Sequence, residues 1–164
     1  FIHNKYQSYL SNQVAKAAEK WMNFHVFNKG NDSSEKCVVA LKKKGYQIIA
    51  TTPHNDSCLL EDFDITKKSA IVFGVEKEGV SDFMMQQADG FLKIPMVGFT
   101  ESLNVSVAAA IILHSITTRL KKSDIQWQLT EEEKNEKRLN WCKKSINNVE
   151  KIIERYHKTL LKTL

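Results

Sequence analysis

Polar and glycine residues that could hold a small ligand gather in three short runs of this 164-residue chain. The runs are Gly74-Val75-Glu76-Lys77-Glu78-Gly79, Ile94-Pro95-Met96 and Ser102-Leu103-Asn104. The first run lies at the end of one strand-like segment, the second ends another, and the third opens a long apolar segment that is typical of a helix. Because α/β sheets bind small ligands at the carboxyl ends of strands and the amino ends of helices, these runs form the candidate site.

Each run also has a purely structural interpretation. Glu76 between two glycines is typical of a tight turn with an exposed carboxylate, although glycines also let backbone approach a ligand. Ser102 or Asn104 before an apolar helix is typical of an N-cap, although free amides and polar side chains there also suit a ligand. Ile94 and Met96 would be ordinary core residues, or they could hold a flat purine. The run from Gly74 has neither the dinucleotide nor the phosphate-loop fingerprint.

Alternating strand and helix patterns must position these runs. The predicted strands are 21–27, 46–51, 69–75 and 90–96. The predicted helices run from a Ser33 or Ser34 cap to Gly45, from a Ser81 cap to Ala88, and over about 103–120. Residues 53–64 are predicted to be a loop. This alternation indicates an α/β fold in which a mostly parallel sheet is covered by helices.

Charge divides the chain near residue 119. Residues 1–118 hold 12 basic and 12 acidic residues, so residues 119–164 carry the entire net charge of +5. We therefore expect one domain over 1–122 and a basic helical extension over 123–164. Such an extension suits a polyanionic partner, although lysine-rich helices can also be no more than solvated surface.

The extension has its own helical signals. Thr130-Glu131-Glu132-Glu133 is a capping box that predicts a helix start. Apolar residues then recur at spacings of three and four, which predicts a seam for docking on the core or on another subunit. The seam is Leu139, Cys142, Ile146, Val149, Ile153, Tyr156 and Leu160. The cations that fall mostly off this seam, and are candidate nucleic-acid contacts, include Lys143, Lys144, Lys151 and Arg155.

Composition narrows the class of protein. At 42% hydrophobic and 26% charged residues the chain can bury a core, and no apolar run is long enough to cross a membrane. Cys37, Cys58 and Cys142 are widely spaced and odd in number, which favours reduced thiols in the cytoplasm. The histidines show no ligand spacing, so no metal site is expected.

Together, and in this order, the three runs resemble the motifs of the SpoU (TrmH-type) branch of the SPOUT methyltransferases. The resemblance covers nearly all of residues 10–120. It implies transfer of a methyl group from S-adenosylmethionine to a ribose 2′-hydroxyl of RNA, a trefoil knot near the carboxyl end of the domain, and a homodimer. By the family pattern the cofactor would be lined by Thr51, Gly74, Ile94, Met96 and Leu103. The positions that match the catalytic centre are Glu76, Ser102 and Asn104.

One family motif has no counterpart here. The family's early Asn followed by an Arg is not found, because the first arginine of the chain is Arg119. We expect the chain to begin inside the family's domain, without the amino-terminal strand–helix unit and its general base. The alternative is a non-catalytic RNA-binding or dimerisation module of the same fold.

The basic extension bears on the substrate. It resembles that of enzymes that methylate a guanosine of tRNA, which favours tRNA over the alternative, rRNA. The sequence leaves open which RNA and which nucleotide is modified.

Overall fold

The structure is a computed structural model that describes residues 2, 21–27, 32–54, 57–99 and 102–160. These residues belong to two compact units, each described here by itself. Unit 1 holds residues 2, 26–27, 32–54, 57–99 and 102–126, and unit 2 holds residues 21–25 and 127–160.

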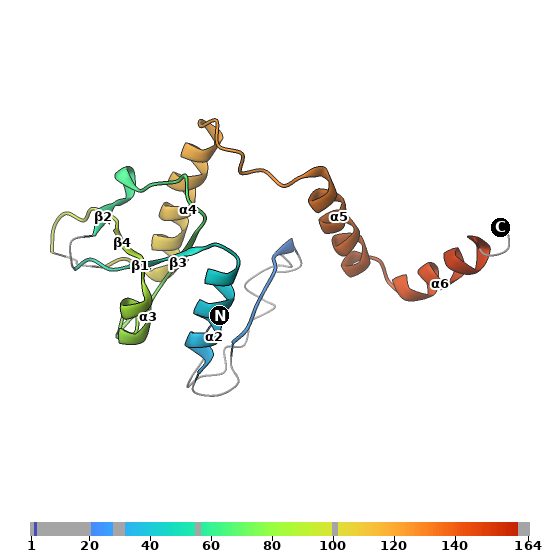
Figure 1. Cartoon of the computed structure of the whole chain (residues 1–164), viewed down its shortest axis with the longest axis horizontal. Helices are drawn as coiled ribbons and strands as arrows, with labels where there is room; N and C mark the ends of the chain where they lie inside the picture. The colour runs from blue at the N-terminus through green and yellow to red at the C-terminus, as the bar shows by residue number, and fades with distance from the viewer. Residues whose placement is uncertain (1, 3–20, 28–31, 55–56, 100–101, 161–164) are drawn as a thin grey trace. The chain divides into compact units, whose positions relative to one another are not determined.

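A four-stranded parallel sheet lies at the centre of unit 1 (Figure 1). Its strand order is β2-β4-β1-β3, and every pairing is parallel. The strands are β1 (Gln47–Thr51), β2 (Cys58–Leu59), β3 (Ser69–Val72) and β4 (Gly90–Lys93). The predicted parallel α/β sheet is therefore confirmed.

The strands differ in detail from the sequence prediction. β3 and β4 end at Val72 and Lys93, a few residues early, because the chain there turns away into the candidate runs. The predicted strand at 21–27 is wrong: in this segment only Phe27 pairs, through an isolated parallel bridge to Ile2. Mixed alternation in so short an apolar run does not distinguish a strand from irregular backbone.

The described residues of unit 1 form three α-helices beside the sheet: α2 (Ser33–Lys43), α3 (Asp82–Gln87) and α4 (Val105–Lys121). The N-cap of α2 is Asp32, not Ser33 or Ser34, and its carboxylate pairs with Lys36 Nζ at 2.8 Å. The predicted loop at 53–64 contains β2 and a 3₁₀ turn, η2 (Leu60–Asp62).

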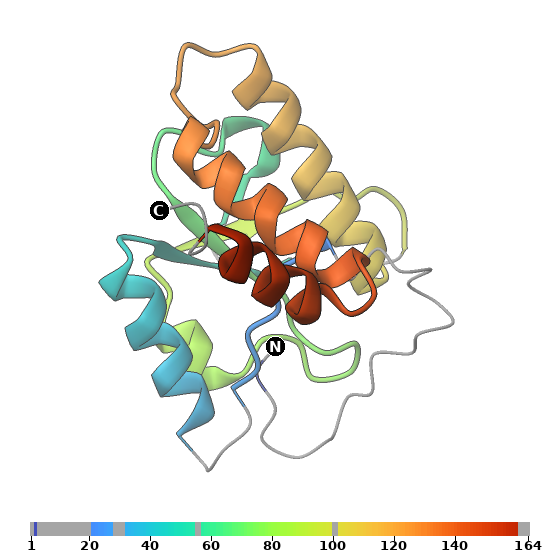
Figure 2. The same cartoon turned by 90° about the vertical axis from the view of Figure 1, so that its right-hand side faces the viewer.

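Consecutive residues of β1 point to opposite faces of the sheet and so build two cores. Ile48 packs with Val38 of α2 and Met84 of α3 on one face. Ile49 packs with Leu92 of β4 and Ile112 of α4 on the other face, and Leu60 and Phe63 complete this second core. Figure 2 shows α2 and α4 on opposite sides of the sheet. The sheet is thus covered on both faces, which explains the continuous apolar sequence of β1.

Unit 2 contains α5 (Glu131–Ser145) and α6 (Val149–Leu160). The capping box is confirmed, since Thr130 Oγ1 accepts from the Glu133 N–H and the Glu133 carboxylate accepts from the Thr130 N–H. The residues of the predicted seam, Leu139 to Leu160, do not lie on one continuous helix: the helix breaks between Ser145 and Val149, where Asn148 has φ +57°. Asparagine tolerates this left-handed conformation better than most residues. Within the unit, the rings of Trp21 and Trp141 meet edge to face at 5.5 Å.

Candidate ligand pocket

The three candidate runs meet at the carboxyl edge of the sheet. Because β1, β3 and β4 are parallel, their carboxyl ends lie side by side, and the start of α4 joins them. A pocket of about 170 Å³ opens there. All five residues predicted to hold the cofactor line it, namely Thr51, Gly74, Ile94, Met96 and Leu103, together with two of the predicted catalytic residues, Glu76 and Ser102.

The run from Gly74 to Gly79 folds back on itself as a tight turn. The Val75 N–H donates to the Gly79 carbonyl at 3.0 Å, and the Gly79 N–H donates to the Val75 carbonyl at 2.9 Å. Gly79 has φ +70°, and a Cβ on Gly74 would lie 2.0 Å from the Gly79 carbonyl carbon. The turn itself therefore requires glycine at position 74, and it holds Glu76 at the pocket.

Two hydrogen bonds fix the end of β1 against its neighbours. Thr51 Oγ1 donates to the Val72 carbonyl of β3 at 2.9 Å, and the Thr52 N–H donates to the Leu92 carbonyl of β4 at 3.1 Å. The Thr51 hydroxyl proton is thus already engaged, and its oxygen can still accept a hydrogen bond from a ligand. These bonds tie the end of β1 to both neighbouring strands where it meets the pocket.

The third predicted catalytic residue, Asn104, has a structural part in this arrangement. It is the N-cap of α4, and its Oδ1 accepts from the Ser106 N–H at 2.9 Å. Asn104 is not among the residues that line the pocket, whereas Ser102 and Leu103, just before it, are. The helix start therefore brings two of its three candidate residues to the pocket and uses the third as a cap.

Sequence reasoning missed much of the pocket wall. The further lining residues are Thr52, Pro53, Phe73, Val75, Gly79, Leu92, Lys93, Val105, Ala108 and Ile112. Phe73, Leu92 and Ile112 have ordinary core patterns, so only the fold could reveal that they also form the pocket floor. Lys93 ends β4 in the structure, whereas the predicted strand continued to residue 96, so its place at the carboxyl end of a strand became visible only in the fold.

The chemistry of the lining is that of an organic ligand. The described lining is mostly apolar and includes the carboxylate of Glu76, the ammonium group of Lys93, and the hydroxyls of Thr51, Thr52 and Ser102. None of the described histidine or cysteine residues lines it. Among the described residues, no group of three or more histidine, cysteine, aspartate or glutamate side chains is placed to hold a metal ion.

No helix in the described part of the chain is long and apolar enough to span a membrane.

The four predicted RNA-binding cations lie on two different helices of unit 2. Lys143 and Lys144 occupy the last turn of α5, whereas Lys151 and Arg155 are one helical turn apart on α6. All four are exposed. The break at residues 146–148 divides them into two pairs.

Known proteins share both the sequence and the fold. A sequence model of the SpoU rRNA Methylase family matches residues 1–114. The tRNA (guanosine(18)-2'-O)-methyltransferase of Borreliella burgdorferi is 37% identical over 147 residues, which cover 90% of this chain and 66% of that protein. The matched part of the chain spans from about a third to about two thirds of the length of the curated relatives it matches.

Two solved structures extend this likeness. The crystal structure of the TrmH/SpoU tRNA modifying enzyme of A. aeolicus matches with a TM-score of 0.73 and 27% identity, covering 89% of this chain and 74% of that one. The SpoU methyltransferase AviRb from Streptomyces viridochromogenes, in complex with the cofactor AdoMet, matches with a TM-score of 0.51 and 28% identity, covering 60% and 38%. The three runs, the parallel sheet and the matched family model agree, and the chain belongs to the SpoU rRNA Methylase family.

Proposed function

We propose that this chain transfers a methyl group from S-adenosylmethionine to the ribose 2′-hydroxyl of a guanosine in tRNA. The observation that carries the proposal is the pocket at the carboxyl edge of the sheet, which the three runs build together. The name of the Borreliella burgdorferi relative supports tRNA and guanosine over rRNA. The reduced thiols of Cys37, Cys58 and Cys142 suit the cytoplasm, where we expect the protein to act.

The lining of the pocket fits the proposed cofactor. Ile94, Met96 and Leu103 supply apolar surface for an adenine ring. Glu76 and Lys93 supply charges opposite to those of the ammonium, sulfonium and carboxylate groups of the cofactor. When bound, S-adenosylmethionine supplies a methyl group that its positively charged sulfur has already activated.

Methyl transfer then requires that the ribose hydroxyl be positioned and its proton removed. Ser102 would orient the ribose, and the Glu76 carboxylate would stabilise a positively charged group beside the ribose 2′-oxygen. Arg119 is not a candidate base, because its guanidinium donates to the Leu60 carbonyl at 3.1 Å and to the Phe63 carbonyl at 2.6 Å. By the family pattern the base is the arginine of an early motif, and no arginine occurs among residues 1–118.

Calorimetric titration with S-adenosylhomocysteine tests the pocket. We expect saturable binding to the chain and its loss in Leu103→Arg, because the new guanidinium would occupy the space proposed for the adenine. Val39→Arg is the matched control, since Val39 is 60% exposed on α2, away from the pocket residues. Absence of binding to the unaltered chain would favour the alternative, a non-catalytic module of the same fold.

Asn104 needs a pair of variants, because it already caps α4. Asn104→Ala removes the cap and is expected to cost about 1 kcal/mol of stability, whereas Asn104→Asp keeps an accepting oxygen. If the side-chain amide also serves the reaction, Asn104→Asp folds normally but transfers tritiated methyl groups to tRNA more slowly than the unaltered chain. Equal transfer rates would leave Asn104 a cap only.

We also propose the trefoil knot and the homodimer that the family resemblance implies. The exposed apolar side chains of α4 support the dimer: Val107, Ile111 and Leu113 are 38–57% exposed, on the helix whose Ile112 is buried in the core. An apolar surface of this kind is typical of a protein interface. Sedimentation velocity is expected to give twice the mass of the single chain, and a monomer at micromolar concentration would contradict the dimer.

A further inference from the structure

A second group of lysines lies at the edge of the sheet opposite the pocket. Lys42, Lys43 and Lys44 end α2 just before β1, and Lys67 and Lys68 immediately precede β3. Parallel strands have their amino ends at a common edge, so the two segments meet there. The Gln47 N–H donates to the Lys68 carbonyl at 2.9 Å, which ties the segments directly. We call these five residues the amino edge.

The carboxylate of Asp89, at this edge, already has a hydrogen-bond donor and an ion-pair partner. Asp89, which precedes β4, accepts from the Ile48 N–H through Oδ2 at 2.7 Å, and its own N–H donates to the Ile48 carbonyl. Its Oδ1 lies 3.6 Å from Lys42 Nζ. Asp89 thus holds the start of β4 against β1 and balances one lysine only.

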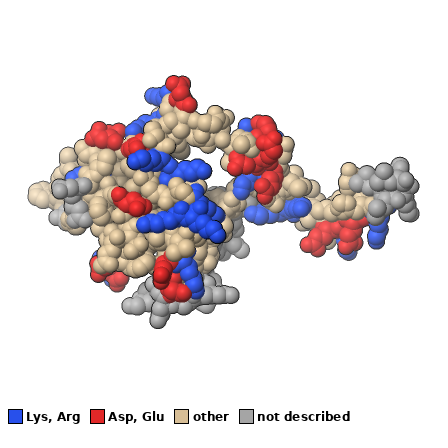
Figure 3. Space-filling model, in the orientation of Figure 1, with Lys and Arg blue, Asp and Glu red and all other residues tan. Residues whose placement is uncertain are grey.

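A second carboxylate, Asp64, balances Lys67. Its Oδ2 lies 4.0 Å from Lys67 Nζ, and hydrogen bonds from the side chain and backbone of Thr66 hold the pKa of Asp64 below its ordinary value. Lys43, Lys44 and Lys68 are exposed, and no described carboxylate lies within ion-pair distance of them. Figure 3 shows lysine and arginine side chains gathered over the end of α2 and the start of β3.

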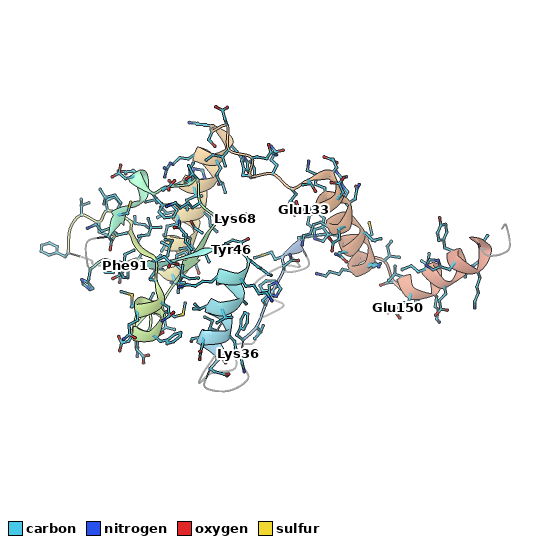
Figure 4. The ribbon with its side chains drawn as sticks, viewed as in Figure 1. Lys36, Tyr46, Lys68, Phe91, Glu133 and Glu150 are labelled. Atoms are coloured by element: carbon cyan, nitrogen blue, oxygen red, sulfur yellow. The ribbon has the colours of Figure 1, made fainter. Side chains whose placement is uncertain are left out.

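This concentration is notable because residues 1–118 are neutral as a whole. Uncompensated cations therefore collect at one edge of the sheet, within a stretch of sequence whose total charge is zero. Tyr46, half-buried at the start of β1, lies in the same place, and Figure 4 labels it with Lys68. Exposed ammonium groups beside an aromatic ring are typical of nucleic-acid contacts, where lysines pair with phosphates and rings stack on bases.

We propose that the amino edge binds phosphates of the same RNA whose ribose enters the pocket. This inference rests on the proposed function. The five residues of β1 separate the two edges by only about 13 Å. Folded RNA extends well beyond that, since a double-stranded RNA-binding domain alone tracks about 16 base pairs. One tRNA can therefore contact the amino edge and the pocket together.

The test compares two double variants of the full chain. Lys44→Gln/Lys68→Gln removes two unpaired cations, and Lys36→Gln/Lys134→Gln removes two cations that already pair, with Asp32 and Glu131. Binding of unmodified tRNA is titrated at several KCl concentrations, and S-adenosylhomocysteine binding is measured on each protein. We expect the first variant to bind tRNA roughly tenfold to thirtyfold more weakly at 150 mM salt, with a salt slope smaller by about 1.5. The control variant should change little.

The outcomes separate the two proposals. Suppose that the unaltered chain binds S-adenosylhomocysteine and tRNA, and that both double variants bind tRNA with the same affinity and salt slope as the unaltered chain. The amino edge then does not contact RNA, and only this inference is overturned. That result would also follow if the edge binds an acidic protein instead. If the unaltered chain binds no tRNA at any salt concentration, the proposed function falls and this inference falls with it.

Discussion

Two glycines of the same turn have different reasons for being glycine. Gly74 has no room for a side chain, because a Cβ there would lie 2.0 Å from the Gly79 carbonyl carbon and 2.2 Å from the Val80 nitrogen. Gly79 has open space around it but a φ of +70°. The first restriction is steric and the second is conformational, so alanine at the two positions tests them separately.

We expect Gly74→Ala to destabilise the protein by about 3 kcal/mol, because backbone atoms of the turn must move. Gly79→Ala should cost only about 1 kcal/mol, the strain of a left-handed alanine. Urea unfolding followed by fluorescence measures both. Gly74→Ala should also weaken S-adenosylhomocysteine binding, since the turn carries Glu76 to the pocket.

Equal losses in the two variants would contradict this distinction. Such a result would mean that the turn adapts to a side chain at position 74 as easily as at position 79. The sequence analysis treated both glycines as candidate ligand contacts. It could not tell the steric restriction at Gly74 from the conformational restriction at Gly79, because the clash at Gly74 arises from residues that only the folded turn brings close.

At the scale of elements, the sequence predicted the sheet better than its connections. The apolar, β-branched content of β1 identified a strand buried on both faces. β2 has two residues, Cys58 and Leu59, and is a strand only because Leu92 and Lys93 of β4 pair with it. No local pattern can indicate an element so short, since its hydrogen bonds come from another part of the chain.

The tail shows the opposite error, in which a regular pattern concealed an interruption. Apolar spacing continues across Ile146 and Val149, yet Asn148 at φ +57° ends one helix and begins the next. Periodicity records which residues are apolar and not the conformation between them. The candidate RNA contacts are therefore two separate pairs.

This division makes the tail contacts testable one helix at a time. Lys143→Ala/Lys144→Ala alters α5 alone, and Lys151→Ala/Arg155→Ala alters α6 alone. If both helices contact tRNA, each double variant should weaken binding and reduce the salt slope by about 1.5, because each removes two phosphate contacts. Filter binding across a range of KCl concentrations measures this. A pair whose removal changes neither quantity belongs to a helix that does not touch RNA.

At the scale of the whole molecule, the candidate site depends on topology. Thr51, Gly74, Ile94 and Leu103 come from four segments of the sequence, and the parallel strand order brings them to one edge. Motif resemblance identified these residues, since spacing along the chain alone does not place them together. The apolar floor was missed because core and pocket residues look the same in sequence, and Lys93 was missed because the predicted strand extended beyond it to residue 96.

The reaction rates of the thiols can measure whether ligand binding in the pocket stabilises the core of unit 1. Cys37 is 9% exposed on α2, and burial raises the pKa of its thiol, so at pH 8 it should stay protonated and unreactive. Cys58 and Cys142 are exposed. With an aromatic disulfide reagent we expect two thiols to react at once and the third only as the protein opens.

Ligand should then slow the third reaction. If Cys37 becomes accessible only when unit 1 unfolds, S-adenosylhomocysteine at 100 times its Kd lowers the unfolded population, and the labelling rate, about 100-fold. A Cys58→Ser/Cys142→Ser variant isolates this signal, and Cys142 in the unaltered chain serves as the control whose rate should not change. Rapid labelling of Cys37 without ligand would contradict its burial. If labelling is slow and saturating ligand does not change its rate, α2 opens by itself, independently of the pocket at the carboxyl end of β1.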